Sequence, residues 1–510
     1  MTQKYIEKIL SARVYDVAIE SPLDEAKRLS ARLENNILLK REDLQPVFSF
    51  KLRGAYNKLF QLSRSKVLTG VIAASAGNHA QGLALAASKL GVKATIVMPK
   101  TTPKIKVDAV RSYGAKAVLV GDTFDEASVY AYKLAEKENL DFIHPYDDPD
   151  VIAGQGTIAV EILRQYPEDI DAIFIPVGGG GLIAGMATFI KYLRPEIKII
   201  GVEPEDAACF AAAMKKKRRV VLDEVGLFAD GVAVKQMGRE TWRIARQLVD
   251  EVITVNTDEI CASIKDIFDD TRTIMEPAGA LAVAGIKKYV AEKGVSQQTL
   301  IAINSGANMN FDRLRHVSER AELGEQREGL IGVTIPEEPG SFLRFCRLIG
   351  KKGITEFNYR YANDSEAYVF AGIQLADGSA ELDELTNKLI DKGYPVLCMS
   401  DNEMAKLHVR YMVGGHANQI ANEVLYRFEF PERPGALLDF LAHIGKRWNI
   451  SMFHYRNHGA AYGRVLVGLQ VAIKERKEVV SFFDELGFKW WDESENPAYK
   501  MFLGPATDQV

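Results

Sequence analysis

Short apolar runs alternate with helix-length segments over most of the chain, from about Leu38 to Met309. The apolar runs occupy residues 71–74, 94–97, 117–120, 172–177, 198–202 and 300–304, and helical patterns lie between them, for example at 79–90 and 124–138. This alternation predicts parallel βαβ units and an open α/β sheet. Such sheets bind ligands at the carboxyl ends of their strands, so the residues that follow each run are the first candidates for a site.

A glycine loop follows the strand predicted at 172–177 and precedes a predicted helix. It consists of Gly178, Gly179, Gly180 and Gly181, with Leu182 beginning the helix. Glycines allow a tight turn whose N–H groups converge, and a helix N-terminus favours negative charge. The loop is neither a Walker loop nor the spaced dinucleotide fingerprint. It predicts a phosphate site, with a flexible turn as the weaker alternative.

A lysine beside an aromatic residue lies in Ser-Phe-Lys-Leu-Arg-Gly, at residues 49–54. Only a neutral amine attacks a carbonyl group, and a partly desolvated pocket lowers a lysine pKa enough to supply one. Lys51, next to Phe50, is therefore a candidate for covalent bonding to a carbonyl compound. Taken alone, the segment fits an exposed lysine at a helix start better.

Two further loops follow predicted strands. The first has the small backbone-exposing residues that suit a substrate carboxylate, and it comprises Ser75, Ala76, Gly77, Asn78 and His79. Its alternative is a plain turn in which Asn78 caps the helix. In the second loop, Ser305 ends the strand at 300–304 and is predicted to face the cleft, although Ser-Gly at a strand end is usually a turn. The segment around Glu276 and Pro277 reads as an ordinary helix start.

Composition excludes several classes of partner. The 510 residues are 47% hydrophobic and 26% charged, with a net charge of −4. That length predicts several domains, and the charge balance indicates neither nucleic acid nor a membrane as a partner. Residues 1–20 lack the apolar core of a signal peptide, and the 4 cysteines stand singly. A cytoplasmic protein is therefore expected.

The last part of the chain contains an internal repeat. Ile-Pro-Glu-Glu-Pro-Gly at 335–340 recurs as Phe-Pro-Glu-Arg-Pro-Gly at 430–435, and further matching blocks follow at a nearly constant offset. Each copy reads as strand, Pro-Gly turn, helix, strand, hairpin and strand, which predicts a duplicated α+β domain. The predicted organisation is a catalytic domain at 1–310, a connector at 311–328, and regulatory domains at 329–405 and 424–505. A dimerisation platform is the alternative role for the duplication.

Together these motifs resemble those of the biosynthetic threonine dehydratases (threonine deaminases), in the tryptophan-synthase-β-like class of pyridoxal-phosphate enzymes. The resemblance covers nearly the whole chain and is carried by Ser-Phe-Lys-Leu-Arg-Gly-Ala, Ser-Ala-Gly-Asn-His, Gly-Gly-Gly-Gly-Leu and Ser-Gly-Ala-Asn-Met-Asn. The tail is similar to the paired ACT-like effector domains of this family. The resemblance implies an α/β, open parallel-sheet catalytic region with two subdomains, followed by two α+β ACT-like regulatory domains.

The resemblance also implies roles for single residues. Lys51 would bond covalently to the aldehyde of pyridoxal 5'-phosphate, and Phe50 would pack against the cofactor ring. Asn78 would hydrogen-bond the ring hydroxyl, and Ser305 would face the pyridine nitrogen. The glycine loop with Leu182 would hold the phosphate.

One departure concerns metal binding. Relatives that resemble serine racemase bind a divalent metal through a Glu, the carbonyl four residues on, and an Asp two further. Glu203 and Ala207 match this pattern, but Cys209 stands in place of the Asp. Because Mg²⁺ and Ca²⁺ prefer oxygen ligands, no metal is expected here.

The reaction implied by the resemblance converts L-threonine to 2-oxobutanoate and ammonia, the first step toward isoleucine. Lys51 would remove the proton from the substrate α-carbon as a general base. A serine dehydratase, or another β-elimination enzyme of this fold, is an alternative, because threonine and serine differ by one methyl group. An amino-acid sensor built on an inactive catalytic scaffold is the alternative of another class.

The tail is predicted to bind effectors. Tyr359 and Arg360 in the first copy recur as Tyr455 and Arg456 in the second, and their rings and donors suit an amino-acid ligand. A packed tyrosine beside a surface arginine fits the pattern equally well. We expect isoleucine to inhibit the enzyme through this tail and valine to relieve the inhibition. The resemblance further implies a homotetramer.

Overall fold

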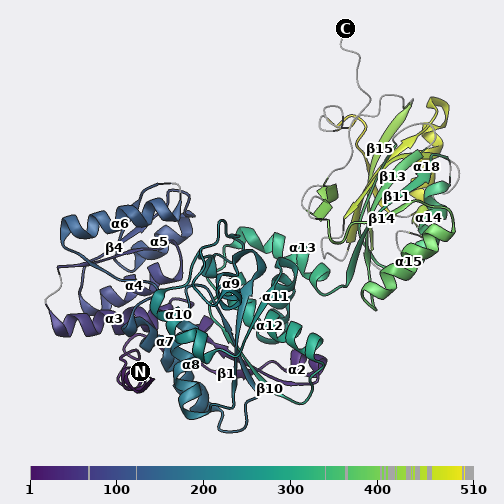
Figure 1. The fold of residues 1–510 in the computed structure, drawn as a ribbon. Helices are drawn as coiled ribbons and strands as arrows, with labels where there is room; N and C mark the ends of the chain where they lie inside the picture. The colour runs from purple at the N-terminus through teal and green to yellow at the C-terminus, as the bar shows by residue number, and fades with distance from the viewer. Residues whose placement is uncertain are drawn as a thin grey trace. The chain divides into compact units, whose positions relative to one another are not determined.

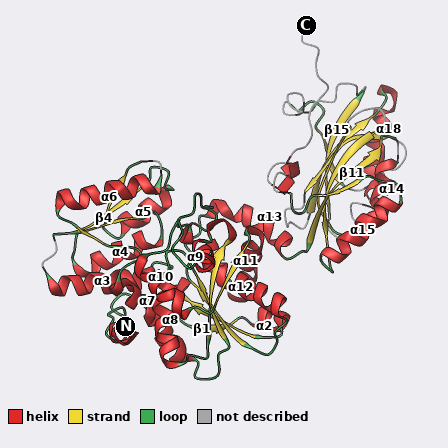
Figure 2. Cartoon of the chain, viewed as in Figure 1, coloured by secondary structure: helices red, strands yellow, loops and turns green. Residues whose placement is uncertain are grey.

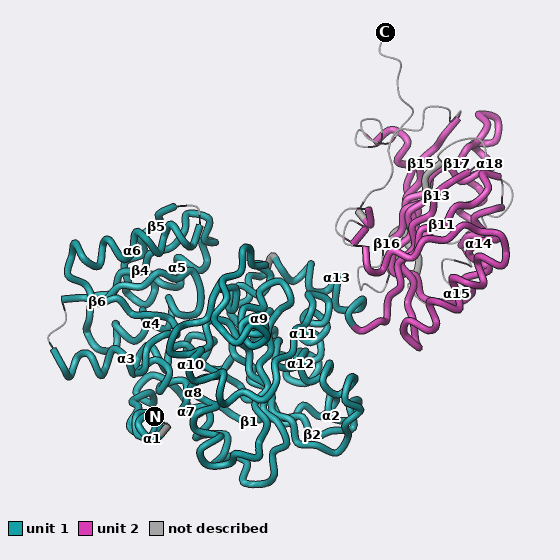
Figure 3. The backbone as a smooth tube through the Cα atoms, in the orientation of Figure 1, with its two compact units in different colours: residues 1–324 teal, residues 325–510 magenta. Residues whose placement is uncertain are grey.

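The computed structural model divides into two compact units, residues 1–324 and 325–510 (Figures 1 and 3). It describes residues 2–503, apart from 67–68, 122, 339, 362–365, 403–404, 407–408, 412–419, 421, 432–437, 439, 443–447, 457–461, 487, 497–498 and 500–502. Within this part of the chain, we find no helix with both the length and the apolar character needed to cross a membrane.

Unit 1 contains two sheets with helices around them (Figure 2). Its strands are β1 (Leu23–Glu25), β2 (Asn36–Arg41), β3 (Val71–Ala74), β4 (Ala94–Met98), β5 (Lys116–Leu119), β6 (Asp141–Phe142), β7 (Ala172–Pro176), β8 (Lys198–Pro204), β9 (Glu251–Val255) and β10 (Thr299–Asn304). Its α-helices are α1 (Thr2–Leu10), α2 (Lys27–Leu33), α3 (Lys51–Ser65), α4 (Asn78–Leu90), α5 (Lys104–Ser112), α6 (Phe124–Glu138), α7 (Pro149–Gln165), α8 (Gly181–Leu193), α9 (Cys209–Lys216), α10 (Arg239–Leu248), α11 (Thr257–Thr271), α12 (Pro277–Lys293) and α13 (Leu314–Gly324). Short 3-10 turns lie at η1 (Glu42–Leu44), η2 (Glu205–Ala207), η3 (Asp230–Val232) and η4 (Phe311–Arg313).

The larger sheet has the strand order β1-β2-β10-β7-β8-β9. Successive side chains of a strand point to opposite faces, and both faces of β7 are apolar. Ile173 and Ile175 pack in the core that contains α7 and α8. Phe174 packs in the core that contains α11 and α12. This double burial explains why the strand reads as a continuous apolar run, as buried parallel strands do.

The smaller sheet has the order β5-β4-β3-β6, with all of its pairings parallel. Val71 and Ala73 of β3 face the core with α3, α4 and α5, whereas Ile72 and Ala74 face α6. Strands β3, β7 and β10 all end where predicted motifs begin, so both sheets deliver loops to the region of the site.

The structure confirms the predicted parallel α/β region and makes one correction to it. The predicted strands are all present, with ends that differ by no more than two residues, and β3 and α6 have the predicted bounds. Strand β1 pairs antiparallel with β2, so the larger sheet is mixed at its edge. A three-residue edge strand carries too little periodic pattern to be recognised.

A buried ion network holds the start of α3. The Arg53 guanidinium lies 2.8 Å from Glu42 and 2.6 Å from Glu161, and the Lys40 amine lies 2.7 Å from Glu161. All four of these side chains are 0% exposed. The network joins β2, η1, α3 and α7, and Arg53 is two residues from Lys51.

Unit 2 is one antiparallel sheet with the strand order β14-β11-β13-β12-β16-β17-β15-β18. Its strands are β11 (Glu328–Pro336), β12 (Ile354–Tyr361), β13 (Glu366–Gln374), β14 (Val396–Cys398), β15 (Glu423–Pro431), β16 (Asn449–Arg456), β17 (Tyr462–Gln470) and β18 (Lys489–Asp492). Its described helices include α14 (Ser341–Ile349), α15 (Ser379–Asp391) and α18 (Arg476–Leu486), with 3-10 turns at η5 (Val409–Tyr411) and η6 (Ile473–Glu475). One continuous apolar core, with Phe345, Leu389 and Phe483 among its members, lies between the sheet and these three helices.

The predicted duplication corresponds to the two halves of this sheet. Each half contains more than was predicted, because a second helix and a fourth strand follow the hairpin: α15 and β14 in the first copy, α18 and β18 in the second. Strand β12 pairs with β16, so the two copies share one sheet. Most of the second Pro-Gly motif, at 432–435, lies outside the described residues.

Candidate functional site

A cavity of about 420 Å³ lies where the loops after β3, β7 and β10 meet the start of α3. Its lining includes all of the residues that the sequence predicted for the cofactor. They are Phe50, Lys51, Asn78, Tyr146, Pro176, Gly178, Gly179, Gly180, Gly181, Leu182, Gly231, Val232, Glu276, Ala278 and Ser305. Five separate motifs, spread over more than half the chain, are thus brought to one cavity.

Lys51 is the first residue of α3. Within the described part of the chain its amine makes no ion pair, and it lies 5.1 Å from the centre of the Phe50 ring. Burial lowers the pKa of the Lys51 amine to about 8, while the nearby Glu276 opposes this shift. A substantial neutral fraction of the amine is therefore present at mildly alkaline pH, which nucleophilic attack and proton abstraction both require.

The glycine loop presents free N–H groups to the cavity. Among the described residues, no protein acceptor takes a hydrogen bond from the N–H groups of Gly178, Gly179, Gly180 or Gly181. The Thr241 hydroxyl donates to the carbonyl of Gly179 at 2.7 Å, which fixes the loop from the other side. Helix α8 begins at Gly181, so its N-terminal dipole adds to an anion site here.

Glycine is required in this loop for two different reasons. Gly180 has φ +90°, a conformation that L side chains rarely adopt. A Cβ on Gly179 would lie 2.3 Å from the ring of Tyr146, so the ring can approach only because that side chain is absent. The loop is therefore a tightly packed cradle, and the flexible-turn interpretation is not supported.

Ser305 follows β10 directly and is buried. Its carbonyl accepts a hydrogen bond from the Phe50 N–H at 3.2 Å, and its hydroxyl donates to the Ala278 carbonyl at 3.3 Å. The next residue, Gly306, bridges to Ser49. These contacts join the serine loop to the lysine segment, although the two are far apart in the sequence.

The loop at 75–79 is only partly in the cavity. Asn78 lines it, whereas Ser75, Ala76, Gly77 and His79 are not among its described lining residues. His79 is buried, with Nε2 3.0 Å from the Ile143 carbonyl, and burial lowers its pKa to about 3. Asn78 is not a helix cap: Gly77 holds that position, and the Asn78 side chain bonds elsewhere.

Glu276 lines the cavity, although the sequence predicted only a helix start for it. It precedes Pro277 at the start of α12, as predicted, but its side chain makes no capping bond. Its carboxyl accepts a hydrogen bond from the Asn78 amide at 2.6 Å. Burial raises the pKa of Glu276 to about 7, Asp230 adds to the rise, and the bond from Asn78 opposes it.

The residues at the positions of the racemase-type metal ligands make contacts within the protein instead. The two carboxylate oxygens of Glu203 each lie 2.8 Å from a backbone N–H, those of Phe210 and Ala211 at the start of α9. Cys209 is buried beside them. Across the described residues, no group of three or more His, Cys, Asp or Glu side chains is arranged to hold a metal ion.

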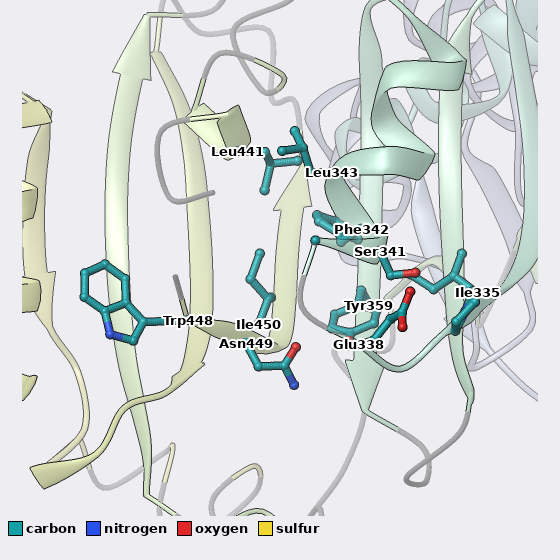
Figure 4. A pocket seen from close by; sticks show the side chains of 12 residues that line it. Ile335, Glu338, Ser341, Phe342, Leu343, Tyr359, Leu441, Trp448, Asn449 and Ile450 are labelled. Carbon is teal, nitrogen blue, oxygen red and sulfur yellow. The ribbon is translucent and has the colours of Figure 1, made fainter. Parts of the chain in front are cut away.

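Unit 2 has its own cavity, of about 350 Å³, lined by residues of both repeats (Figure 4). Tyr359 lines it and donates its hydroxyl to Glu337 at 2.6 Å. The other carboxylate oxygen of Glu337 accepts from the Asn449 amide at 2.9 Å, which links the two repeats. The Ser341 hydroxyl in its lining is buried and has no hydrogen-bond partner within the described residues.

Of the other predicted effector residues, Tyr455 has a described side chain, and it is not among the described residues that line this cavity. Tyr455 is 1% exposed and lies in the apolar core, paired across the sheet with Phe357. The backbones of Arg360 and Arg456 belong to β12 and β16, but their side chains lie outside the described part of the structure.

Comparison with known proteins divides the chain in the same way, into a first part and two C-terminal repeats. Residues 14–306 match a family described as pyridoxal-phosphate dependent enzyme. Residues 319–409 and 414–503 each match the C-terminal regulatory domain of threonine dehydratase. The chain is 54% identical to biosynthetic L-threonine dehydratase IlvA of Burkholderia multivorans, over 98% of this chain and 99% of that protein. It is 53% identical to the enzyme of the same name from Escherichia coli, over 98% and 97%.

Solved structures agree with this result. The processed form of threonine deaminase isoform 2 from Solanum lycopersicum has a TM-score of 0.62 and 53% identity, covering 63% of this chain and 93% of that one. Maize serine racemase has a TM-score of 0.57 and 31% identity, covering 62% and 96%. The full-length identity, the matched catalytic region and the two matched regulatory domains all lead to one conclusion: the chain belongs to the biosynthetic threonine dehydratase family of pyridoxal-phosphate enzymes.

Proposed function

We propose that this chain converts L-threonine to 2-oxobutanoate and ammonia at the cavity around Lys51. One observation carries the proposal: a desolvated lysine amine and a loop whose N–H groups have no acceptor among the described residues line the same cavity. Pyridoxal phosphate requires both features, a neutral amine for its aldehyde and a cradle for its phosphate. The residues present therefore fit this cofactor.

Different residues would hold the cofactor and act on the substrate. Gly178 to Leu182 would hold the phosphate, and Phe50 would pack on the ring. Asn78 would donate to the ring hydroxyl, and the Ser305 hydroxyl would face the ring nitrogen. The bound cofactor supplies an electron sink for the charge that develops at the substrate α-carbon. Lys51 Nζ would take the α-proton, and the loop at 75–79 would orient the substrate carboxylate.

The test of this proposal is turnover of L-threonine compared with L-serine. We expect kcat/KM to favour threonine, although one methyl group in a pocket is worth only about 1–3 kcal/mol. A ratio that favours serine would instead assign the chain to serine dehydration.

Replacing Ser305 by aspartate is expected to lower kcat for threonine by at least about tenfold, or about 1.4 kcal/mol in the barrier. The aspartate carboxylate would favour the protonated form of the ring nitrogen and a longer-lived carbanion. Slower side reactions, such as racemisation, would then compete better with dehydration. The measurement is 2-oxobutanoate formation, together with chiral analysis of the remaining threonine. Full activity without racemised threonine would show that the neutral hydroxyl is not needed.

We also propose that unit 2 binds amino-acid effectors, with isoleucine as inhibitor and valine as the ligand that relieves inhibition. The unit 2 cavity supports this, because it offers the Ser341 hydroxyl, which has no partner among the described residues, together with the Tyr359–Glu337 pair and an apolar wall. Arg360, Tyr455 and Arg456 stay predictions, and so do the homotetramer and the cytoplasmic location.

A chain that stops at Arg327 is expected to keep cofactor binding and threonine turnover but to lose inhibition by isoleucine. This cut falls before β11 and three residues after the last residue of unit 1, Gly324. In the full chain, effector coupling of about 1–3 kcal/mol would be ordinary. The measurement is threonine turnover by both chains at several isoleucine concentrations. Undiminished inhibition of the shortened chain would show that the effector site lies in unit 1.

A further inference from the structure

Glu276 contacts the cavity from the start of α12, and its side chain is 4% exposed. Its Oε1 atom lies 2.6 Å from Nδ2 of Asn78, and the backbone N–H of Asn308 also donates to its carboxyl. A buried carboxyl is costly unless its oxygens are satisfied. The first of these bonds comes from Asn78, which also lines the cavity, so the Glu276 carboxyl is held at the cavity wall.

Contacts at both ends fix the orientation of the Asn78 amide. Its Nδ2 donates to Glu276, and its Oδ1 accepts from Nδ2 of Asn308 at 2.7 Å. Asn308 is itself anchored, because the same nitrogen donates to the Val47 carbonyl at 2.8 Å. A primary amide carries two N–H groups, and only one of those of Asn78 is used by Glu276. The second N–H remains for a ligand in the cavity.

The neighbouring glycine shows how closely this carboxyl is packed. A Cβ on Gly306 would lie 2.6 Å from Oε1 of Glu276 and 3.1 Å from the Cβ of Ser49. The glycine after Ser305 therefore leaves the space that Glu276 occupies. This gives the Ser-Gly pair a role beyond that of a turn.

We propose that Glu276 is a positioning residue: its carboxyl oxygen holds the Asn78 amide so that the second N–H of that amide is presented to the bound pyridoxal phosphate. This inference rests on the proposed function, because it assumes that the cavity holds the cofactor. Asn308 completes the arrangement by holding the amide oxygen. Glu276 acts through Asn78 and needs no contact with the substrate.

The experiment compares two substitutions at this position in the full chain. Glu276→Gln keeps an oxygen that can accept from Asn78, whereas Glu276→Leu keeps the volume and removes the acceptor. The readouts are the Kd for pyridoxal phosphate, the absorption spectrum of the bound cofactor, and the Tm of the cofactor-free protein. We expect Glu276→Leu to raise Kd about tenfold and shift the absorption band, as the loss of one ordinary hydrogen bond implies. Glu276→Gln should stay within about threefold and keep the band.

Two more variants make the test specific. Asn308→Ala removes the restraint at the other end of the amide and should produce the same spectral shift. Glu203→Leu is the matched control, because Glu203 is also a buried carboxyl whose pKa burial raises to about 7, but it lies in β8, accepts from backbone N–H groups of α9 and is outside the cavity lining. It should lower Tm without moving the band.

The outcomes separate this inference from the proposed function. If the unsubstituted chain binds no pyridoxal phosphate, both are wrong. If it binds the cofactor but Glu276→Leu leaves Kd and spectrum unchanged, the positioning role alone is wrong. The role also fails if Glu276→Leu behaves as Glu203→Leu does, with a lower Tm and an unmoved band. Should Glu276→Leu not fold, Glu276→Gln and Asn308→Ala still decide: a shifted band in the first, or an unshifted band in the second, overturns the proposal.

Discussion

Replacing Lys51 by alanine is expected to lower kcat for L-threonine by at least about 10³-fold, because positioned acid–base groups contribute about 10²–10⁴-fold. The protein should stay folded, since the Lys51 amine has no ion pair among the described residues. After borohydride reduction in the presence of pyridoxal phosphate, peptide mapping should find the cofactor on Lys51. Because burial lowers the pKa of this amine to about 8, attachment should speed up as pH rises through 8 and then level off.

Lys58 provides the matched control on the same helix. Burial alone would lower its pKa, but ion pairs with Asp148 and Asp150 raise it, so its amine stays charged. Lys58→Ala should keep the cofactor and the label at Lys51. Labelling of any lysine other than Lys51 in the unsubstituted chain would contradict the assignment.

Replacing Arg53 by methionine is expected to lower the free energy of unfolding by about 3–5 kcal/mol, because breaking a buried ion pair leaves uncompensated charge. Glu42 would lose its guanidinium partner, and Glu161 would keep Lys40 as its remaining cationic partner among the described residues. Since Arg53 anchors the first turn of α3, cofactor binding at Lys51 should weaken as well. Urea unfolding of the cofactor-free protein measures the first effect, and a pyridoxal phosphate titration measures the second.

The comparison for Arg53 is a surface pair. Arg164 and Glu20 also form an ion pair, but their side chains are 61% and 41% exposed. Arg164→Ala should cost no more than about 1 kcal/mol, the upper range for exposed pairs. Equal losses for the two substitutions would mean that the buried network does not stabilise unit 1 more than a surface contact does.

Local signals explain where the sequence predicted the fold well. Helix α6 has the predicted bounds because Thr123 and Glu126 form a capping box at its start. Strand β7 was recognisable because both of its faces are buried. Family, fold class and cofactor were also predicted and are confirmed, since they rest on several motifs in a fixed order.

Contacts between distant segments explain what the sequence did not reveal. Glu276 reads locally as a helix start, and its second role depends on Asn78, 198 positions away. The division of the strands between two sheets also depends on which strands pair, and this pairing is not local in the sequence. For example, β2 pairs with β10, which lies near the other end of unit 1. In unit 2, Leu382, Leu385 and Leu389 of α15 have helical spacing, so this helix could have been predicted from the sequence. The sequences of α15 and α18 are too different for the two helices to be recognised as parts of the repeat.

The pairing of β12 with β16 has a consequence for how the regulatory half can be divided. A chain cut between the copies would leave β12 paired with β13 on one side only, as an edge strand of eight residues whose other side has its backbone donors and acceptors open to other molecules. Such edges invite aggregation or exchange of strands between chains. Each copy therefore covers an edge strand of the other, and we expect either copy expressed alone to be less soluble than the pair.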